Sequence, residues 1–165
     1  MAQSTRTVTL DRGDLPTIVA GVLLVNVVGA APAVLSGPGS PWFQALVKPA
    51  IYPPPWVFGV VWTALFTLLG VTLALVWLAE AGRTRQVALG LFVAQMVLNV
   101  AWTPAFFALE NLLWGLVVIV ALWPLVAATL WAFARVDRRA AVLVVPYLAW
   151  VTFAAVLNYQ FLALN

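Results

Sequence analysis

The sequence predicts an all-α membrane protein: a single domain, residues 1–165, built as a bundle of five transmembrane helices with a Pro-rich loop between the first two. Of its 165 residues, 65% are hydrophobic and only 8% are charged, whereas an ordinary soluble domain has about 25% charged residues. Long windows carry no charge at all, namely 15–47, 49–79, 86–109, 111–134 and 140–165. About 20 mostly apolar residues are enough for a helix to span a bilayer. A soluble core would need polar helix faces, which these windows lack.

The first predicted helix covers residues 15–35, with Asp14 placed to cap its start. Pro32 near its end is expected to kink or stop it, because proline removes a backbone donor and clashes with the preceding turn. A basic start, an apolar stretch and Ala-Pro-Ala at 31–33 would also fit a signal peptide, although the apolar run is long for one.

A Pro-rich loop separates this helix from the second, predicted over 56–79. The stretch from Trp42 to Trp62 contains three consecutive prolines, 53–55. Consecutive prolines favour an extended polyproline path, and the last one suits a helix start. We therefore expect a stiff loop that feeds an aromatic-rich helix. We interpret this loop as the lid of a binding pocket whose walls are the five helices.

Three more helices complete the chain, over 87–109, 112–134 and 140–164. Short links join them: 80–85 (EAGRTR), 110–111 and 135–139 (RVDRR). Pro104 falls inside the 87–109 helix, where membrane proteins tolerate proline, typically with a kink. The sequence shows no internal repeat.

The positive charges predict how the bundle is oriented. Five spans place the amino terminus and the links after the second and fourth helices on one side, which then collects Arg6, Arg12, Arg83, Arg85, Arg135, Arg138 and Arg139, while the other side has only Lys48. Positive residues accumulate on the cytoplasmic side. The amino terminus is therefore expected in the cytoplasm, with the Pro-rich loop and carboxyl terminus on the opposite side. The pI of about 10.0 could also suggest nucleic-acid binding. The excess of Lys and Arg is better explained by membrane orientation, because these residues flank long apolar spans.

Missing residue types exclude several kinds of chemistry. The chain has no Cys and no His, which argues against disulfides, zinc sites and imidazole catalysis, and we expect no metal or cofactor. The four later helices have no charged residue in their interiors. Ion-coupled transport and acid–base hydrolysis usually need such groups, so neither is expected.

The 87–109 helix has two distinct faces on a helical wheel. Gly90, Ala94 and Ala101 share one face, a small-residue strip that allows another helix to approach closely and that suggests a dimer interface. The opposite face carries Gln95, Asn99, Trp102 and Phe106. Amides are costly in lipid, so this face should point inward. The alternatives are small-residue packing within one chain and purely structural hydrogen bonds between helices.

Aromatic residues on two other helices are predicted to lie at the same depth. Phe58, Trp62 and Phe66 form a stripe on the second helix, and Trp150, Ala154 and Leu157 form one on the fifth, flanked by Tyr147 and Asn158. The helix directions place all of them in the half of the bilayer beneath the Pro-rich loop. Aromatic stripes also occur in cores and at membrane interfaces. If these helices are neighbours, they enclose an aromatic pocket suited to flat hydrophobic ligands.

Four stretches, taken in order, resemble the TspO/MBR family, the tryptophan-rich sensory proteins related to the mitochondrial translocator protein or peripheral benzodiazepine receptor. They are Trp42 to Lys48-Pro49 with Pro53-Pro54, Trp56-Val57-Phe58 and Trp62; Ala94-Gln95, Asn99, Trp102, Pro104 and Phe106-Phe107; Trp123, Ala127-Ala128-Thr129, Trp131 and Asp137; and Pro146-Tyr147, Trp150, Phe153-Ala154 and Leu157-Asn158.

The resemblance implies a five-helix bundle, commonly a homodimer, that binds porphyrins such as protoporphyrin IX beneath its first loop. The implied ligand-binding residues are Trp56, Phe58, Trp62, Asn99, Trp102, Phe106, Trp150, Ala154 and Leu157, to which the helical wheel adds Tyr147. The chain departs from the family pattern at Ala50 and Ile51, where aromatics are common. It also has no Lys or Arg after Tyr159, so the sterol-contact pattern is incomplete.

Three functions are compatible with this reading. The leading one is a membrane receptor or transporter-like protein that binds tetrapyrroles. The second is light-dependent oxidative degradation of a bound porphyrin, with Trp62 and Trp150 as redox partners and no acid–base pair required. The third is a regulatory membrane partner whose pocket holds membrane lipid.

Overall fold

The computed structural model describes residues 10–165 and is all-helical over that range. Arg6, which belongs to the predicted basic side, lies outside the described residues. Five helices are long and apolar enough to cross a membrane: α1 (Leu15–Leu35), α3 (Pro55–Leu78), α4 (Arg83–Thr103), α5 (Leu112–Ala134) and α6 (Arg138–Leu164). The prediction of five transmembrane helices is thereby confirmed. The loop after α1 contains the short helix α2 (Pro41–Ala45), which the sequence analysis treated as loop.

Side-chain caps mark where several helices begin. Ser40 Oγ accepts a hydrogen bond from the Phe43 backbone N–H at the start of α2 (3.2 Å), and Asn111 Oδ1 accepts one from Trp114 N–H at the start of α5 (2.9 Å). Asp14 does not cap α1. Instead it accepts from the Asp11 N–H (2.9 Å) and helps to close a 3₁₀ turn that precedes the helix.

The helix ends differ from the predicted ones where charged residues continue a helix beyond its apolar window. α4 begins at Arg83 rather than at 87, and α6 at Arg138 rather than at 140. Hydropathy marks the part of a helix that lies in lipid, whereas polar residues at the interface still form helical hydrogen bonds. Pro104 opens a π-helical turn, Pro104–Ala108, and the chain then turns at Glu110, whose φ is +49°.

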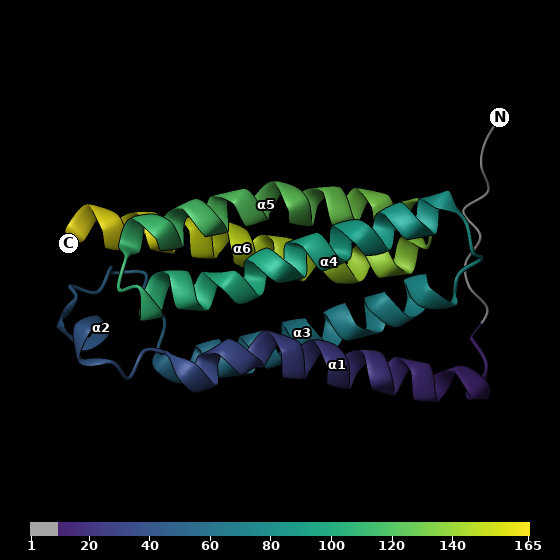
Figure 1. Ribbon diagram of the computed structural model, residues 1–165, viewed down its shortest axis with the longest axis horizontal. Coiled ribbons are helices and arrows are strands. Elements are labelled where there is room, and N and C mark those ends of the chain that lie inside the picture. Colours follow the sequence, from purple (N-terminus) through teal and green to yellow (C-terminus); the bar gives the residue numbers. More distant parts are fainter. Residues whose placement is uncertain (1–9) are drawn as a thin grey trace.

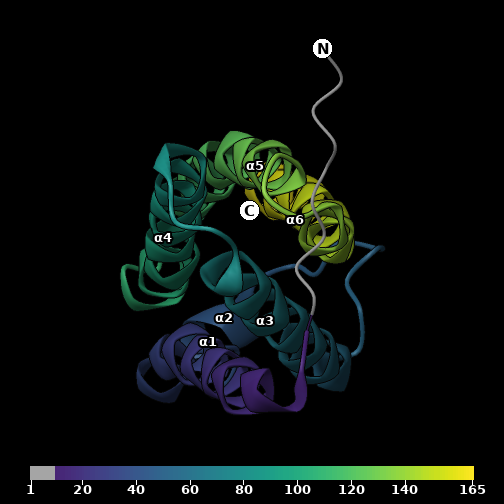
Figure 2. The ribbon, with the colours of Figure 1, turned by 90° about the vertical axis from the view of Figure 1, so that its right-hand side faces the viewer.

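The bundle consists of two groups of helices. α1 packs on α3, while α5 packs on both α4 and α6; the two groups meet mainly where α3 contacts α6 and α1 contacts α4. Figure 2, an end view, shows α1 and α3 together below an arc of α4, α5 and α6. In Figure 1 the groups lie further apart at the end where α2 and the loop around it lie.

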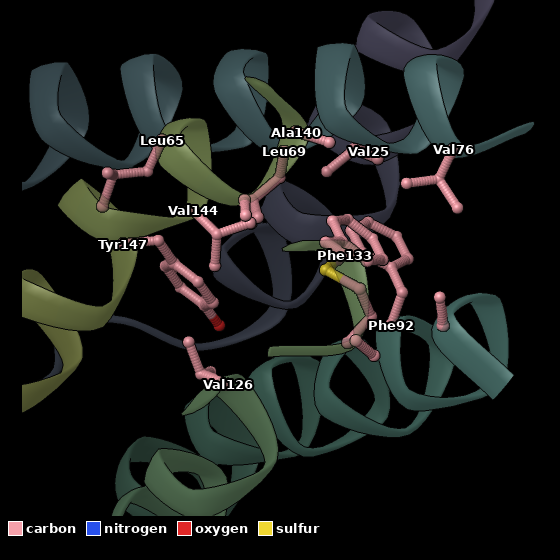
Figure 3. Close-up of a cluster of buried hydrophobic side chains, with 14 of the residues drawn as sticks. Val25, Leu65, Leu69, Val76, Phe92, Val126, Phe133, Ala140, Val144 and Tyr147 are labelled. Carbon is pink, nitrogen blue, oxygen red and sulfur yellow. The ribbon is translucent and has the colours of Figure 1, made fainter. Parts of the chain in front are cut away.

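The end without α2 is closed by a buried apolar cluster (Figure 3). Phe92 of α4 stacks on Phe133 of α5 with ring centroids 5.9 Å apart and planes 13° apart, and Val76 of α3 is fully buried against the same cluster. Figure 1 shows α1's start, the α3–α4 link and the α5–α6 turn at this end. Buried rings therefore fill the space between the two helix groups at the arginine-rich end, whereas a cavity lies between them at the other end.

A candidate ligand-binding cavity beneath the lid

A cavity of about 380 Å³ lies between the two helix groups at the end covered by α2. Ligand sites in proteins typically measure about 300–1,000 Å³. Aromatic and small residues form most of its walls, with a few amides and hydroxyls among them. The residues of α3, α4, the π-helical turn after α4, and α6 that line it include Phe58, Gly59, Trp62, Thr63, Phe66, Asn99, Trp102, Thr103, Phe106, Trp150, Ala154, Leu157 and Asn158.

Most of the residues that the sequence analysis proposed for ligand binding line this one cavity. They are Phe58, Trp62, Asn99, Trp102, Phe106, Trp150, Ala154 and Leu157. Two others do not line it: Trp56 is 69% exposed on the outer surface of α3, and Tyr147 is buried behind the wall. That these residues bind a ligand stays a prediction.

Paired aromatic rings give the cavity its walls. Trp62 and Trp150 meet edge to face, with centroids 6.5 Å apart and planes 88° apart. Trp62 also lies 5.2 Å from Phe66, and Trp102 stacks on Phe106 at 5.2 Å. Edge-to-face and offset contacts are the favoured geometries for aromatic pairs, so the rings hold one another in place around the empty space.

A buried hydrogen-bond chain lies behind one wall of the cavity. Asn99 Nδ2 donates to the Tyr147 hydroxyl (2.8 Å), and that hydroxyl donates to Gln95 Oε1 (3.0 Å). The inward-facing amides of the predicted 87–109 helix are thus satisfied by α6, although Gln95 Nε2 is buried without a partner among the described residues. Of these three hydrogen-bonded residues, Asn99 is the one that lines the cavity. Tyr147, which is itself bonded to Gln95, therefore determines how the Asn99 amide is held.

A second polar contact joins α4 to α6 on the cavity wall. Trp102 Nε1 donates to Asn158 Oδ1 (3.2 Å), and Asn158 Nδ2 donates to the Ala154 carbonyl within α6 (2.8 Å). Because each amide group is paired, Asn158 can lie among apolar rings at little cost.

α1 forms a wall of the cavity, as expected of a pocket walled by all five helices, but none of its residues was singled out from the sequence. Asn26, Gly29, Ala30 and Ala33 of α1 line it. Asn26 Nδ2 donates to the Val22 carbonyl (2.9 Å) and to Thr67 Oγ1 of α3 (3.3 Å) and so joins the two helices. A single amide in an otherwise apolar helix is a sign of an inward-facing position, and this was the signal available in the sequence.

The lid packs onto the cavity through a second aromatic cluster. Phe43 of α2 lies 6.1 Å from Phe106, 5.2 Å from Phe107 and 5.6 Å from Phe161. Tyr52 follows in the extended part of the loop, 5.5 Å from Phe58, and its partial burial raises the pKa of its phenol. The lid therefore contributes aromatic rings at Phe43 and Tyr52, and both line the cavity.

Two sets of polar contacts fix the lid, one within the loop itself and one to the end of the chain. The Lys48 ammonium donates to the carbonyls of Phe43 and Leu46 and lies 4.2 Å from the centre of the Phe43 ring, and partial burial lowers its pKa. The Asn165 amide makes a two-way contact with Val47: Oδ1 accepts from the Val47 N–H (2.8 Å), and Nδ2 donates to the Val47 carbonyl (3.2 Å).

Comparison with known proteins agrees with this architecture. The model of the TspO/MBR family matches residues 21–164. The chain belongs to this family. It is 45% identical to the tryptophan-rich protein TspO of Chlorobaculum tepidum, over 78% of this chain and 82% of that protein. It is 42% identical to the tryptophan-rich sensory protein of Cereibacter sphaeroides (75% and 77%) and 42% identical to the human translocator protein (74% of each).

The match to the TspO/MBR family includes almost all of the five spanning helices and the lid between α1 and α3. Together with the length and hydropathy of those helices, it makes this protein an integral multi-pass membrane protein.

The small-residue strip of α4 lies on the outside of this TspO/MBR-family bundle. Gly90 and Ala94 are exposed and Ala101 is half-buried. A Cβ added at Gly90 would meet no atom within 4 Å, so the packing of this chain alone does not require a glycine there. Dimer formation through this strip stays a prediction.

Proposed function

We propose that this protein is a membrane receptor or transporter-like protein that binds tetrapyrroles of the protoporphyrin IX type, and similar flat hydrophobic molecules, in the cavity beneath the lid. The observation that carries the proposal is the cavity of about 380 Å³, walled by Trp62, Trp102, Phe106 and Trp150. Aromatic faces suit flat ring systems, and a few convergent polar groups orient a ligand.

The polar groups available to a ligand are few. Asn99 Oδ1 accepts no hydrogen bond from the part of the chain that the structure describes, and Nε1 of Trp62 and of Trp150 donates none there. No charged side chain lines the cavity. Binding would therefore depend mainly on apolar contact, which favours a largely hydrophobic ligand.

A titration in the dark tests this proposal. Purified protein in detergent is titrated with protoporphyrin IX while tryptophan fluorescence is followed. Saturable quenching is expected for the wild type, and Asn99→Leu or Trp102→Ala should weaken it, because both residues line the cavity. Trp131→Phe, which alters an exposed tryptophan outside the cavity, serves as the control. Quenching that does not saturate would refute the proposal.

A second candidate function is light-dependent oxidative degradation of the bound porphyrin. The contact between Trp62 and Trp150 favours it, since two indoles 6.5 Å apart on the cavity wall could exchange an electron with a light-excited ring, with dioxygen as the oxidant. Illuminating the complex and following the porphyrin absorption bands tests this. The double variant Trp62→Phe with Trp150→Phe should lose the photochemistry and bind more weakly. Full photochemistry in that variant would remove the two residues from this role.

We also propose that the protein forms a homodimer through the strip of α4 that contains Gly90 and Ala94. Close approach at small residues is a common way for membrane helices to associate. Gly90→Leu should fill the contact and shift the protein towards monomer in cross-linking and sedimentation experiments, whereas Ala121→Leu, at an exposed small residue of α5, should not. An unchanged dimer in Gly90→Leu would contradict the assignment.

A further inference from the structure

A second apolar cavity lies on the side of the bundle, separate from the candidate ligand site. Its volume is about 710 Å³, and it shares no lining residue with the cavity beneath the lid. α1, α3 and α4 enclose it, so we call it the lateral groove. Its lining residues are Thr17, Ala20, Gly21, Leu24, Val25, Val28, Leu73, Ala74, Trp77, Leu89, Phe92, Val93, Met96, Val97 and Val100.

The lateral groove has the length of one membrane leaflet. On α4 it extends from Leu89 to Val100, which at about 1.5 Å per residue corresponds to ~17 Å. The hydrocarbon core of a bilayer is about 30 Å thick, so one leaflet contributes about half of that. The groove begins near the arginine-rich end, since Thr17 lies in the first turn of α1 and Trp77 in the last turn of α3. It therefore lies along the leaflet at that end.

The mouth of the lateral groove carries an arginine with donors to spare. The Arg85 guanidinium lies 5.7 Å from the centre of the Trp77 ring, which itself lines the groove. Arg85 Nη1 donates to the carbonyls of Trp77 (3.1 Å) and Ala79 (3.0 Å), which fixes the side chain in place. Nε is buried without a partner among the described residues, and Nη2 makes no hydrogen bond to them.

The charges around this mouth favour a negatively charged headgroup. Arg83 and Arg12 are exposed at the same end of the bundle, and Glu80 is the acidic residue of the α3–α4 link. Lys and Arg side chains near a membrane surface attract anionic lipid. Arginine also binds phosphate with particularly good geometry, because its donors form a planar fork.

We propose that the lateral groove binds one anionic phospholipid from the leaflet at the arginine-rich end. An acyl chain lies along α1 and α4 between Leu24, Leu89 and Val93, and the phosphate lies at Arg85 beside the Trp77 ring. The proposal is independent of the ligand that enters the cavity beneath the lid, because the two sites share no lining residue.

Native mass spectrometry of the purified protein tests the headgroup contact. The protein is incubated in detergent with phosphatidylglycerol or with phosphatidylcholine of the same chain length. One phosphatidylglycerol per chain should bind about tenfold more tightly than phosphatidylcholine. Arg85→Gln should abolish that difference and Arg85→Lys should retain part of it, whereas Arg138→Gln, at an exposed arginine of the α5–α6 turn, should leave it unchanged. Equal binding of the two lipids to the wild type would overturn the proposal.

A substitution inside the groove tests the acyl-chain contact and leaves the Arg85 hydrogen bonds intact. Val93 is 59% exposed and lines the groove, and Val117 of α5 is 45% exposed and lies outside it. Val93→Trp should fill the groove and reduce phosphatidylglycerol binding about tenfold, while Val117→Trp should not. Unchanged phosphatidylglycerol binding in Val93→Trp would refute the lipid site, whether or not the variant also weakens the dimer proposed through Gly90 and Ala94.

Discussion

Tyr147 connects α6 to two amides of α4, and its hydroxyl is both a donor and an acceptor there. It is 1% exposed, and its ring lies 6.3 Å from that of Trp62 on the cavity wall. A buried hydroxyl in this position satisfies Gln95 Oε1 and one N–H of Asn99 together. The residue thus supports the cavity from behind, since it orients Asn99 and packs against Trp62 without lining the space itself.

Tyr147→Phe should therefore destabilise the protein by about 1 kcal/mol, because the Gln95 and Asn99 amides lose their shared partner. The measurement is the midpoint of thermal unfolding in detergent, compared with that of Tyr159→Phe. Tyr159 is 62% exposed, so its hydroxyl should contribute little. Equal midpoints for wild type and Tyr147→Phe would show that the buried chain adds nothing to stability.

For single residues, the sequence indicated which side chains point into the bundle but not which of them contact one another. The wheel of the 87–109 helix placed Gln95 and Asn99 on the inward face, and both are buried. Their partner Tyr147 lies 48 residues beyond Asn99 in the chain. Nothing in local spacing identifies such a pair, because it depends on how α4 and α6 pack against each other.

Two glycines allow α1 and α3 to pack in direct backbone contact. A Cβ added at Gly21 would lie 2.6 Å from the Gly70 carbonyl oxygen, and one added at Gly70 would lie 2.7 Å from the Gly21 carbonyl oxygen and against Val22 Cα. Backbone atoms cannot move aside as a flexible side chain does. This contact keeps the α1–α3 pair together on one side of the cavity.

Gly70→Ala should force the two helices apart and cost about 1–3 kcal/mol of unfolding free energy, the usual range for overpacking. Chemical unfolding in detergent measures it. Gly59→Ala is the matched control on the same helix, because a Cβ there meets no atom within 4 Å and alanine favours helix. The idea fails if the two variants have the same stability.

The lid depends on the contact between Asn165 and Val47 for its position over the cavity. Asn165→Ala removes both hydrogen bonds to the Val47 backbone, so the Val47 amide should exchange with deuterium faster than in the wild type. Gln160→Ala, in the same part of α6, should leave that exchange unchanged, since Gln160 makes no hydrogen bond to the lid through its side chain. Identical exchange in Asn165→Ala and wild type would mean that the aromatic cluster around Phe43 alone holds the lid.

The long helices were predictable because an uncharged window of more than 20 residues has few alternatives to a helix when it lies in a membrane. α2 was missed because five residues are too few for any periodicity, and its proline-rich surroundings indicated a loop. The residues of α1 that line the cavity were not identified, for a different reason. Its sequence is apolar on every side, so no face stands out, and a few residues, Gly21, Asn26 and Gly29, mark the side that meets α3.

Taken as a whole, the molecule is asymmetric from one end to the other. Its arginine-rich end is closed by buried rings such as Phe92 and Phe133, whereas its other end contains the cavity and a lid with a single cation, Lys48. A ligand reaching the cavity would therefore come from the lid side or from the lipid around it. Which cellular compartment that is depends on the orientation of the bundle.

The charge distribution predicts that orientation. Of the seven Lys and Arg residues within the described range 10–165, Lys48 alone belongs to the lid side, and positive residues favour the cytoplasmic side. The chain has no cysteine, so single cysteines can report on each side without background. Ala50 in the lid and Ala81 in the α3–α4 link are both exposed. In intact cells, a membrane-impermeant maleimide should label Ala50→Cys at once and Ala81→Cys only after permeabilisation, which provides the accessibility control for both. The reverse order would place the lid in the cytoplasm, and the cavity would then receive ligand from inside the cell.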